Sequence, residues 1–278
     1  MGSPRFSMYH STDITGQLVV LGSGTSVGVP AIGCNCPVCT SNDRRNNRTR
    51  SSVILGLPQG NLLIDTTPDL RTQLLREKIG IVHAVAFTHS HADHLFGLDD
   101  VRLFPLYLGH AMPLYCRAEV ENQIRRSFDY AFTDQQPTHV GAVPQLSFVR
   151  VGDAPLEVLG ARVIPIPLQH GRFDVLGFRL GDVAYCTDTN GIPQSSWPLL
   201  ENLDTLILDA LRPRPHPTHF SLEEAIDVAR RVGARQTYFT HLTHELGHAE
   251  TEANLPPGMA LAYDGLRVPI VAGTLRVP

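Results

Sequence analysis

The most regular pattern along the chain is a series of short apolar runs rich in valine, isoleucine and leucine. Runs of this kind are typical of buried β-strands. Segments with helical spacing of apolar positions lie between some of them, at 68–78, 118–128 and 221–234. The third segment has a capping box, Ser221 with Glu224, and a stop at Gly233. The predicted strands are QLVVL, SSVILGL, NLLID, AVAF, RVIPIPL, VLGFRL, VAYCT, TLILDA and QTYFT.

This order of elements predicts the fold class. Strands that alternate with helices indicate an α/β fold, and strands that follow one another directly indicate mixed sheets. We expect two packed mixed sheets with helices outside, an αββα sandwich. We find no internal repeat or long linker, so residues 1–278 are interpreted as one domain. Residues 1–16 are interpreted as an N-terminal extension, and residues 33–50 as a loop that contains cysteines.

Charge and composition narrow the classes of function. The formal net charge is -4 and the pI is about 6.3, so no global basic field gathers nucleic acid. A phosphate-bearing substrate therefore needs a local site. The N-terminal 16 residues contain no apolar signal-peptide core, and no later segment approaches the roughly 18 apolar residues of a membrane span. We expect a soluble cytoplasmic protein without a membrane partner.

The stretch THSHADHL, residues 88–95, places three histidines and an aspartate directly after the strand AVAF. Loops at strand ends are common locations for functional groups in α/β sheets. His89 and His91 can project the same way from an extended segment and share one ion. Asp93 and His94 can then face a second ion. These four side chains cannot complete two sites, because divalent metals such as zinc usually have about four to five ligands.

More ligands must come from distant parts of the chain. His170 follows the strand RVIPIPL, Asp188 follows VAYCT, and His241 follows QTYFT. A lone histidine at a strand end is usually an ordinary hydrogen-bonded residue. Three independent strand ends that each offer a metal ligand favour a shared metal centre.

The five cysteines suggest a second metal site. Cys34, Cys36 and Cys39 lie in GCNCPVC, where their spacing suits a shared metal better than a disulfide framework. A closed structural zinc needs a fourth ligand, and the best candidate is His244, three residues after His241, with His248 as runner-up. Cys116 and Cys186 lie alone in apolar segments and are interpreted as buried core thiols.

The HxHxDH pattern of residues 89–94 resembles that of the metallo-β-lactamase fold hydrolases. The resemblance implies that His170 is the next ligand, that Asp188 bridges two metals and that His241 is the last histidine. It assigns His89, His91 and His170 to one ion, and Asp93, His94 and His241 to the other. Asp65 in LLIDTTPD is similar to the family's early aspartate, which supports the site without binding metal.

Further blocks narrow the resemblance to the PhnP branch, which contains cyclic phosphodiesterases. They are LGSGTSVGVPAIGCNCPVC, RTRSSV, LLIDTTPDLR, THSHADHLFGLDDVRLF and THLTHE. This branch has a structural zinc bound by three cysteines and a histidine, which implies that role for Cys34, Cys36, Cys39 and His244. Residues 106–163 and the N-terminal extension show little resemblance.

Other residues are candidates for substrate recognition. HPTHFSLEEAIDVARRVGA resembles a loop and helix of phosphodiesterases related to ribonuclease Z, which implies that His219 binds a phosphate oxygen or protonates the leaving group. The turn GSGTSVG either presents amides to a phosphate or only turns the chain. Asp99 and Asp100 are candidates for orienting metal ligands. Arg48, Arg50 and Arg102 either pair with these aspartates or substrate phosphate, or form surface salt bridges.

The function predicted from these observations is hydrolysis of a small or cyclic phosphodiester. Two divalent ions, zinc or manganese, activate a water as hydroxide, with Asp93 and His219 as catalytic residues and one further zinc in a structural role. The alternatives are a ribonuclease Z-like processing nuclease and a non-catalytic metal-binding carrier or sensor of the same fold. We expect no extended nucleic acid as partner, and the resemblance suggests a homodimer.

Overall fold

The computed structural model describes residues 11–133 and 138–270. Most of the expected N-terminal extension, residues 1–10, therefore lies outside the described residues. In the described chain the strands form two seven-stranded sheets. The first sheet has the order β14-β1-β2-β3-β4-β5-β6, and the second β13-β12-β11-β10-β9-β8-β7. Both sheets contain parallel and antiparallel pairs, so the predicted mixed α/β class is confirmed.

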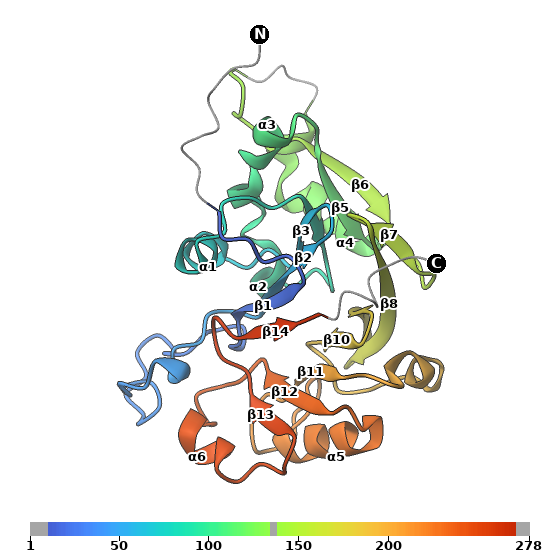
Figure 1. Cartoon of the computed structure of the whole chain (residues 1–278). Helices are drawn as coiled ribbons and strands as arrows, with labels where there is room; N and C mark the ends of the chain where they lie inside the picture. The colour runs from blue at the N-terminus through green and yellow to red at the C-terminus, as the bar shows by residue number, and fades with distance from the viewer. Residues whose placement is uncertain (1–10, 134–137, 271–278) are drawn as a thin grey trace.

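The strands of the first sheet come from residues 17–150, apart from β14 near the C-terminal end of the described chain (Figure 1). Their bounds are β1 Gln17–Gly22, β2 Ser52–Leu57, β3 Gly60–Ile64, β4 Ala84–Ala86, β5 Met112–Cys116, β6 Leu146–Arg150 and β14 Arg267–Pro269. Those of the second sheet are β7 Leu156–Val158, β8 Ala161–His170, β9 Phe173–Leu180, β10 Val183–Cys186, β11 Thr205–Asp209, β12 Gln236–Thr240 and β13 Met259–Leu261.

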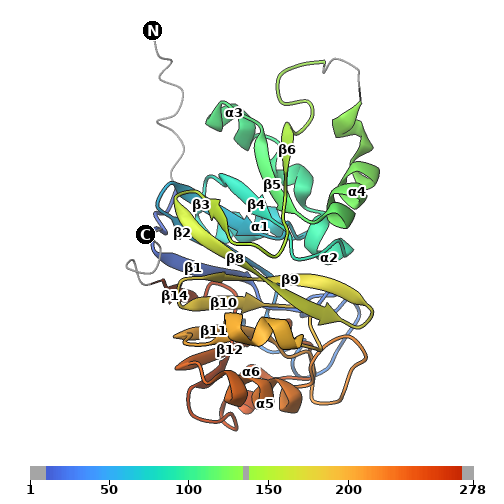
Figure 2. The ribbon, with the colours of Figure 1, turned by 90° about the vertical axis from the view of Figure 1, so that its right-hand side faces the viewer.

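Helices cover the outer faces of both sheets, which gives the predicted four layers (Figure 2). On the first sheet lie α1, Leu70–Glu77, and α4, Ala118–Ser127. On the second lies α5, Leu222–Val232, with the predicted Ser221 capping box and Gly233 in the left-handed conformation. Shorter helices are α2 Ala92–Leu95, α3 Phe104–Leu108 and α6 His248–Glu252. Short 3-10 helices lie at Arg44–Asn46, Leu98–Val101, Asp129–Phe132 and Gln194–Leu200.

The buried apolar side chains form three clusters, one between each pair of layers. Leu55, Ile64 and Phe178 belong to the cluster between the two sheets. Leu74 and Ile124 pack helices α1 and α4 on the first sheet, and the α5 helix packs on the second through Ala225 and Ala229. Cys116 and Cys186 are buried among these apolar groups, as the sequence predicts. Burial on both faces explains why the central strands are continuous apolar runs.

The two sheets share one arrangement that the sequence does not reveal as a repeat. From β14 to β6 in the first sheet, and from β7 to β13 in the second, three antiparallel pairings are followed by three parallel ones. Chain ends of parallel strands meet at one edge of a sheet, where loops gather side chains from distant segments. β3 and β4 in the first sheet, and β10, β11 and β12 in the second, deliver the site described below.

The turn GSGTSVG is held by the protein itself. The amide of Ser23 donates to Asp264, that of Gly24 to the carbonyl of Thr49, and that of Thr25 to the carbonyl of Leu242, at 2.8–3.2 Å. These amides are therefore engaged within the fold, which supports the structural alternative over a phosphate cradle. A Cβ atom on Gly24 would lie 2.7 Å from the carbonyl oxygen of Arg48, so only glycine fits this approach.

Asp264 gathers several donors in the interior near this turn. It accepts hydrogen bonds from the amides and hydroxyls of Ser23 and Thr49 at 2.6–2.9 Å, and pairs with Arg76 at 3.0 Å. Because five donors converge on one buried carboxylate, its removal leaves several polar groups without a partner.

We expect Asp264→Ala to lower the free energy of unfolding by about 3 kcal/mol, because buried donors lose their shared acceptor. Urea denaturation followed by circular dichroism measures this change. The matched control is Asp227→Ala, which removes an exposed Asp227–Arg230 pair and should change stability by less than about 0.5 kcal/mol. Equal losses in the two variants would contradict this account of Asp264.

Candidate metal centre

The seven residues of the predicted dinuclear site lie together at the edge where the strand ends meet. His89 and His91 follow β4, Asp93 and His94 lie in or beside the short helix α2, and His170 ends β8. Asp188 and His241 follow β10 and β12. The ligating atoms form two groups, each within 4.8 Å: His89, His91, His170 and Asp188, and then Asp93, His94, Asp188 and His241.

Asp188 belongs to both groups and lies between them. Its Oδ1 atom is 3.2 Å from Nε2 of His94, and its Oδ2 atom is 3.4 Å from Nε2 of His241 and 3.8 Å from Nε2 of His89. Asp93 Oδ2 lies 3.3 Å from His94 Nε2 and 3.8 Å from His241 Nε2. Ligands about 2.1 Å from one ion are separated by roughly 3.0–3.5 Å, so most of these distances suit a shared cation.

Three of the histidines are oriented by hydrogen bonds at Nδ1, the ring nitrogen that faces away from the site. Nδ1 of His94 lies 2.8 Å from Asp65, that of His89 is 2.9 Å from the Thr88 hydroxyl, and that of His170 is 2.7 Å from the carbonyl oxygen of Thr218. Thr88 in turn donates its amide and hydroxyl to Asp65. A proton on Nδ1 of each ring satisfies these acceptors and leaves Nε2 with a lone pair directed into the site.

The backbone adopts a rarely populated conformation at three of these strand ends. Asp65, Asp188 and His241 have positive φ angles of 66°, 51° and 62°. Such angles are uncommon for residues other than glycine and concentrate at functional sites. The sheets thus impose the directions of these side chains at a cost in local backbone energy.

The electrostatics of the site favour positive charge at its centre. Burial lowers the pKa of His89 and His170, so these two imidazoles are neutral near pH 7. Burial also opposes the charged form of His241, but the adjacent carboxylates, Asp188 foremost, outweigh it and raise the pKa to about 9. The same carboxylates raise the pKa of His94. A cluster of acidic groups that stabilises imidazolium protons also stabilises a cation at that place.

The buried nitrogens themselves provide the test of whether metals fit. Within residues 11–133 and 138–270, Nε2 of His89, His94 and His241 is buried and makes no hydrogen bond of acceptable geometry, although oxygens of Asp188 lie 3.2–3.8 Å away. Buried polar atoms in proteins are nearly always paired. Together with the shared carboxylate of Asp188, this donor set fits two adjacent divalent cations, as the sequence predicts. Their number and identity remain predictions.

His219 lies against this group and reveals a residue that the sequence did not. Its ring stacks on that of His241 with centroids 4.6 Å apart, and its Nδ1 lies 2.9 Å from Oδ2 of Asp209. Asp209 is fully buried at the end of β11, and its other oxygen is 3.7 Å from Nδ1 of His241. The only available signal was an aspartate that ends the apolar run TLILD, a position equivalent to those before His89 and His241.

One face of the site is open. His91 is exposed, unlike the other ligands of its group, and its ring contacts Phe173, at a centroid distance of 5.8 Å. Phe173 begins β9 and is 61% exposed. The mouth of the site is therefore bordered by an aromatic ring at the β8–β9 turn.

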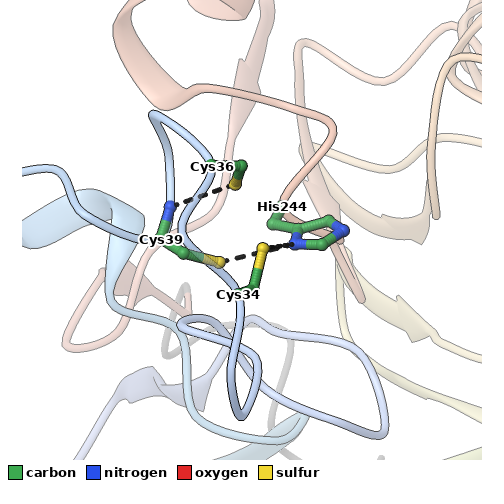
Figure 3. Close-up of side chains that lie close together, drawn as sticks. All are labelled: Cys34, Cys36, Cys39 and His244. Carbon is green, nitrogen blue, oxygen red and sulfur yellow. Dashed lines mark hydrogen bonds between the residues drawn. The ribbon is translucent and has the colours of Figure 1, made fainter.

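Cys34, Cys36, Cys39 and His244 form the separate group that the sequence predicts (Figure 3). Nδ1 of His244 lies 3.2 Å from the sulfur of Cys34 and 3.4 Å from that of Cys39. The edges of a tetrahedral zinc site with sulfur and nitrogen ligands measure about 3.5 Å, so the four atoms fit one zinc ion. Burial raises the pKa of the Cys39 thiol to about 11, so its thiolate needs a nearby cation.

His248, the alternative fourth ligand, lies elsewhere. It begins helix α6, and its Nε2 is 2.6 Å from Glu252. The aspartates and arginines proposed from the sequence to orient metal ligands or bind substrate have other partners in the structure. Asp99 pairs with Arg102 and accepts a bond from Tyr130, instead of orienting a metal ligand.

Asp99, Asp100 and Arg102 line a cavity of about 850 Å³ against helix α1. Arg50 pairs with Asp69, and Arg48 is buried and bonds to carbonyl groups. Arg102 therefore pairs with one of the two aspartates, Asp99, in an exposed salt bridge, as predicted. Arg50 forms a salt bridge with a different aspartate, and Arg48 fits neither alternative.

Comparisons with known proteins now place this geometry in a family. Residues 60–242 match the family described as beta-lactamase superfamily domain. The chain is 45% identical to a solved diphosphatase from the PhnP family, with 91% of this chain and 96% of that one covered and a TM-score of 0.85. The chain belongs to the PhnP family of the beta-lactamase superfamily. The resemblance to this family inferred from the sequence is therefore confirmed.

This PhnP-family chain is also similar to proteins named for other activities. It is 36% identical over 265 residues to an octanoyltransferase of Porphyromonas gingivalis. The matched region covers 94% of this chain and 53% of that protein. The chain thus spans about half the length of this relative. Zinc-bound PqqB from Methylobacterium extorquens, 19% identical over 91% of this chain and 99% of its own, has a TM-score of 0.73 and shows the same fold. In the described residues no helix combines the length and apolar character that a membrane crossing requires.

We expect Cys36→Ser to release the metal of the cysteine group and to lower the midpoint of thermal unfolding, because metal binding contributes directly to folding free energy. Elemental analysis and differential scanning calorimetry measure both effects. The matched control is Asp93→Ala, which alters the other group and should leave one zinc per chain in place. An unchanged thermal midpoint in the cysteine variant would contradict a structural zinc.

Proposed function

We propose that this chain is a dinuclear metal-dependent phosphodiesterase that hydrolyses a small or cyclic phosphodiester. The observation that supports it is the pair of donor groups that share Asp188, with His219 beside them. We assign His89, His91 and His170 to one ion, and Asp93, His94 and His241 to the other. Zinc and manganese both accept this mixture of imidazole and carboxylate.

Two adjacent divalent ions lower the pKa of a water molecule and neutralise the charge that develops on phosphoryl oxygens. The residues of the chain hold this arrangement rigid. Asp65, through Thr88 and His94, fixes the rings that face the centre. Asp188 would offset the repulsion between the cations, because its Oδ1 atom lies near His94 of one group and its Oδ2 atom lies near His89 of the other. Asp93, in helix α2, would hold the second ion together with His94 and His241.

His219 supplies the group that acts on the substrate. Nδ1 of His219 donates a hydrogen bond to Asp209, whose carboxylate would stabilise the doubly protonated ring. In that form the Nε2–H group would hydrogen-bond a non-bridging phosphate oxygen or give its proton to the leaving alkoxide. The stacked His241 ring fixes the plane of the imidazole.

The PhnP-family relative called a diphosphatase favours a second substrate class. A phosphoric anhydride presents the same phosphoryl centre, with a phosphate instead of an alkoxide as leaving group. The same residues can bind and align both types of bond. We rank the phosphodiester first because His219 is placed to protonate a poor leaving group, which an anhydride does not require.

Three other activities have less support. A ribonuclease Z-like nuclease needs a basic surface for RNA, whereas the chain has a formal net charge of -4. A non-catalytic carrier is disfavoured because the ligand set for two ions is complete. We infer that the octanoyltransferase activity named for the Porphyromonas gingivalis protein belongs to the part that this chain does not match.

The deciding experiment compares hydrolysis of bis(p-nitrophenyl) phosphate, a 2',3'-cyclic nucleotide, a dinucleoside diphosphate and a precursor tRNA, with added zinc or manganese. We expect turnover of the first two substrates, with loss of activity in EDTA and recovery with metal. Turnover of the diphosphate alone would favour the anhydride. Cleavage of the tRNA alone would favour the nuclease, and retention of two ions without any turnover would favour the carrier.

We expect Asp188→Asn and Asp93→Ala to reduce kcat by about three orders of magnitude or more, because each removes a carboxylate from the dinuclear site. Stopped assays with excess manganese measure the residual rate. Zinc in the cysteine group should stay bound in both variants. A variant with two retained ions and near-normal turnover would contradict the assignment of that aspartate.

We expect Asp209→Asn to lower kcat by about 10–100-fold with little change in metal content, because His219 loses its fixed proton position. The expected decrease is smaller for substrates with a p-nitrophenolate leaving group, which needs no proton, than for a cyclic nucleotide. Equal losses on both substrates would instead indicate that Asp209 acts through His241 alone.

A further inference from the structure

The two candidate metal groups share one short segment of the chain. His241, directly after β12, belongs to the dinuclear group, and His244 belongs to the cysteine group. The histidines are three residues apart, so a shift of this segment displaces a ligand of each group. The residues that hold 241–246 in place therefore matter for both sites.

Arg48 makes the main side-chain contacts to this segment. Its Nη1 donates to the carbonyl oxygen of Thr243 at 2.8 Å, and its Nη2 to that of Leu246 at 2.6 Å. These two carbonyls lie on either side of His244. The guanidinium also bonds to the carbonyl oxygen of Arg45 and, at 3.4 Å, to Oδ1 of Asn46. Arg48 is 1% exposed, so solvent cannot replace these bonds.

The backbone of Arg48 links these contacts to the cysteines. Arg48 and Val29 exchange two main-chain hydrogen bonds of 2.7 and 2.8 Å, so they close the loop that contains Cys34, Cys36 and Cys39. From the other side, Leu242 bonds to Ser23 and Thr25 through its own amide and carbonyl. The segment 241–246 is thus held at both ends by the stretch 23–48, which supplies the three thiols.

Burying this arginine is costly, which suggests a specific role. Among the described residues no carboxylate forms a salt bridge with Arg48, and burial lowers its pKa to about 10. A buried cation with only neutral acceptors is energetically unfavourable. The planar fork of a guanidinium spans two carbonyls at once, whereas a lysine ammonium is a single point.

We propose that Arg48 is a positioning residue that couples the cysteine site to the dinuclear site by fixing the segment 241–246. It binds no metal and touches no substrate. It sets the place of His244 through the carbonyls on either side of it, and the place of His241 through the same rigid segment. The inference is independent of which bond the enzyme hydrolyses.

The test uses the full chain with zinc in the cysteine group, and the variants Arg48→Lys and Arg48→Met. We expect both to transfer this zinc to a chromogenic chelator about tenfold faster than the wild type, as for other residues that orient metal ligands. In cobalt-substituted protein, the thiolate-to-cobalt absorption band should shift or weaken. Manganese affinity of the dinuclear group, measured by electron paramagnetic resonance, should fall as well.

Arg50→Met is the matched control, because Arg50 pairs with Asp69 and bonds to the carbonyl of Ser26 without reaching the 241–246 segment. Its zinc release and cobalt spectrum should equal those of the wild type. Folded Arg48 variants with wild-type release rates and spectra would overturn the proposal, even if their thermal midpoints fall. Failure of both to fold in excess zinc would also overturn it, since Arg48 would then support the whole fold.

Discussion

The structure depends on the burial of two sheets against each other, because only this packing brings their strand ends to one edge. No single segment of the chain contains enough ligands for either candidate metal group. The first sheet supplies His89, His91, Asp93 and His94, and the second supplies His170, Asp188 and His241. The apolar contacts between the sheets therefore determine the separation of the ligands as much as the ligands themselves do.

The parts of this architecture that could be predicted from sequence are those with strong local signals. The central strands are continuous apolar runs, and α5 has a capping box at one end and a glycine at the other. The strands missing from the predicted set are β5, β6, β7, β13 and β14, and all except β5 lie at a sheet edge. β13 and β14 have three residues each, and β6 contains no fully buried residue, so the period that identifies a strand is absent there.

In the candidate site too, residues with a strong local sequence signal were predicted and isolated residues were not. The HxHxDH and GCNCPVC clusters are visible because ligands recur at short spacing, and the family resemblance extended the set to the distant strand ends. Asp209 had no neighbouring motif, and its partner His219 is ten residues away. From the sequence, Arg48 is indistinguishable from an exposed arginine in a polar loop, because only the folded structure shows that its guanidinium is buried. Which amides of GSGTSVG are already bonded is likewise a property of the folded chain.

The spacing between His241 and His244 has a consequence for how this protein can vary. The backbone leaves β12 with a left-handed residue and reaches the second site after two intervening positions. An inserted or deleted residue there would shift one histidine relative to the other by about 3.5 Å, more than the span of a coordination bond. The Leu242 side chain is buried in the apolar cluster of the second sheet, and neighbouring residues hydrogen-bond to the main chain of both Leu242 and Thr243, so this stretch has almost no freedom in length.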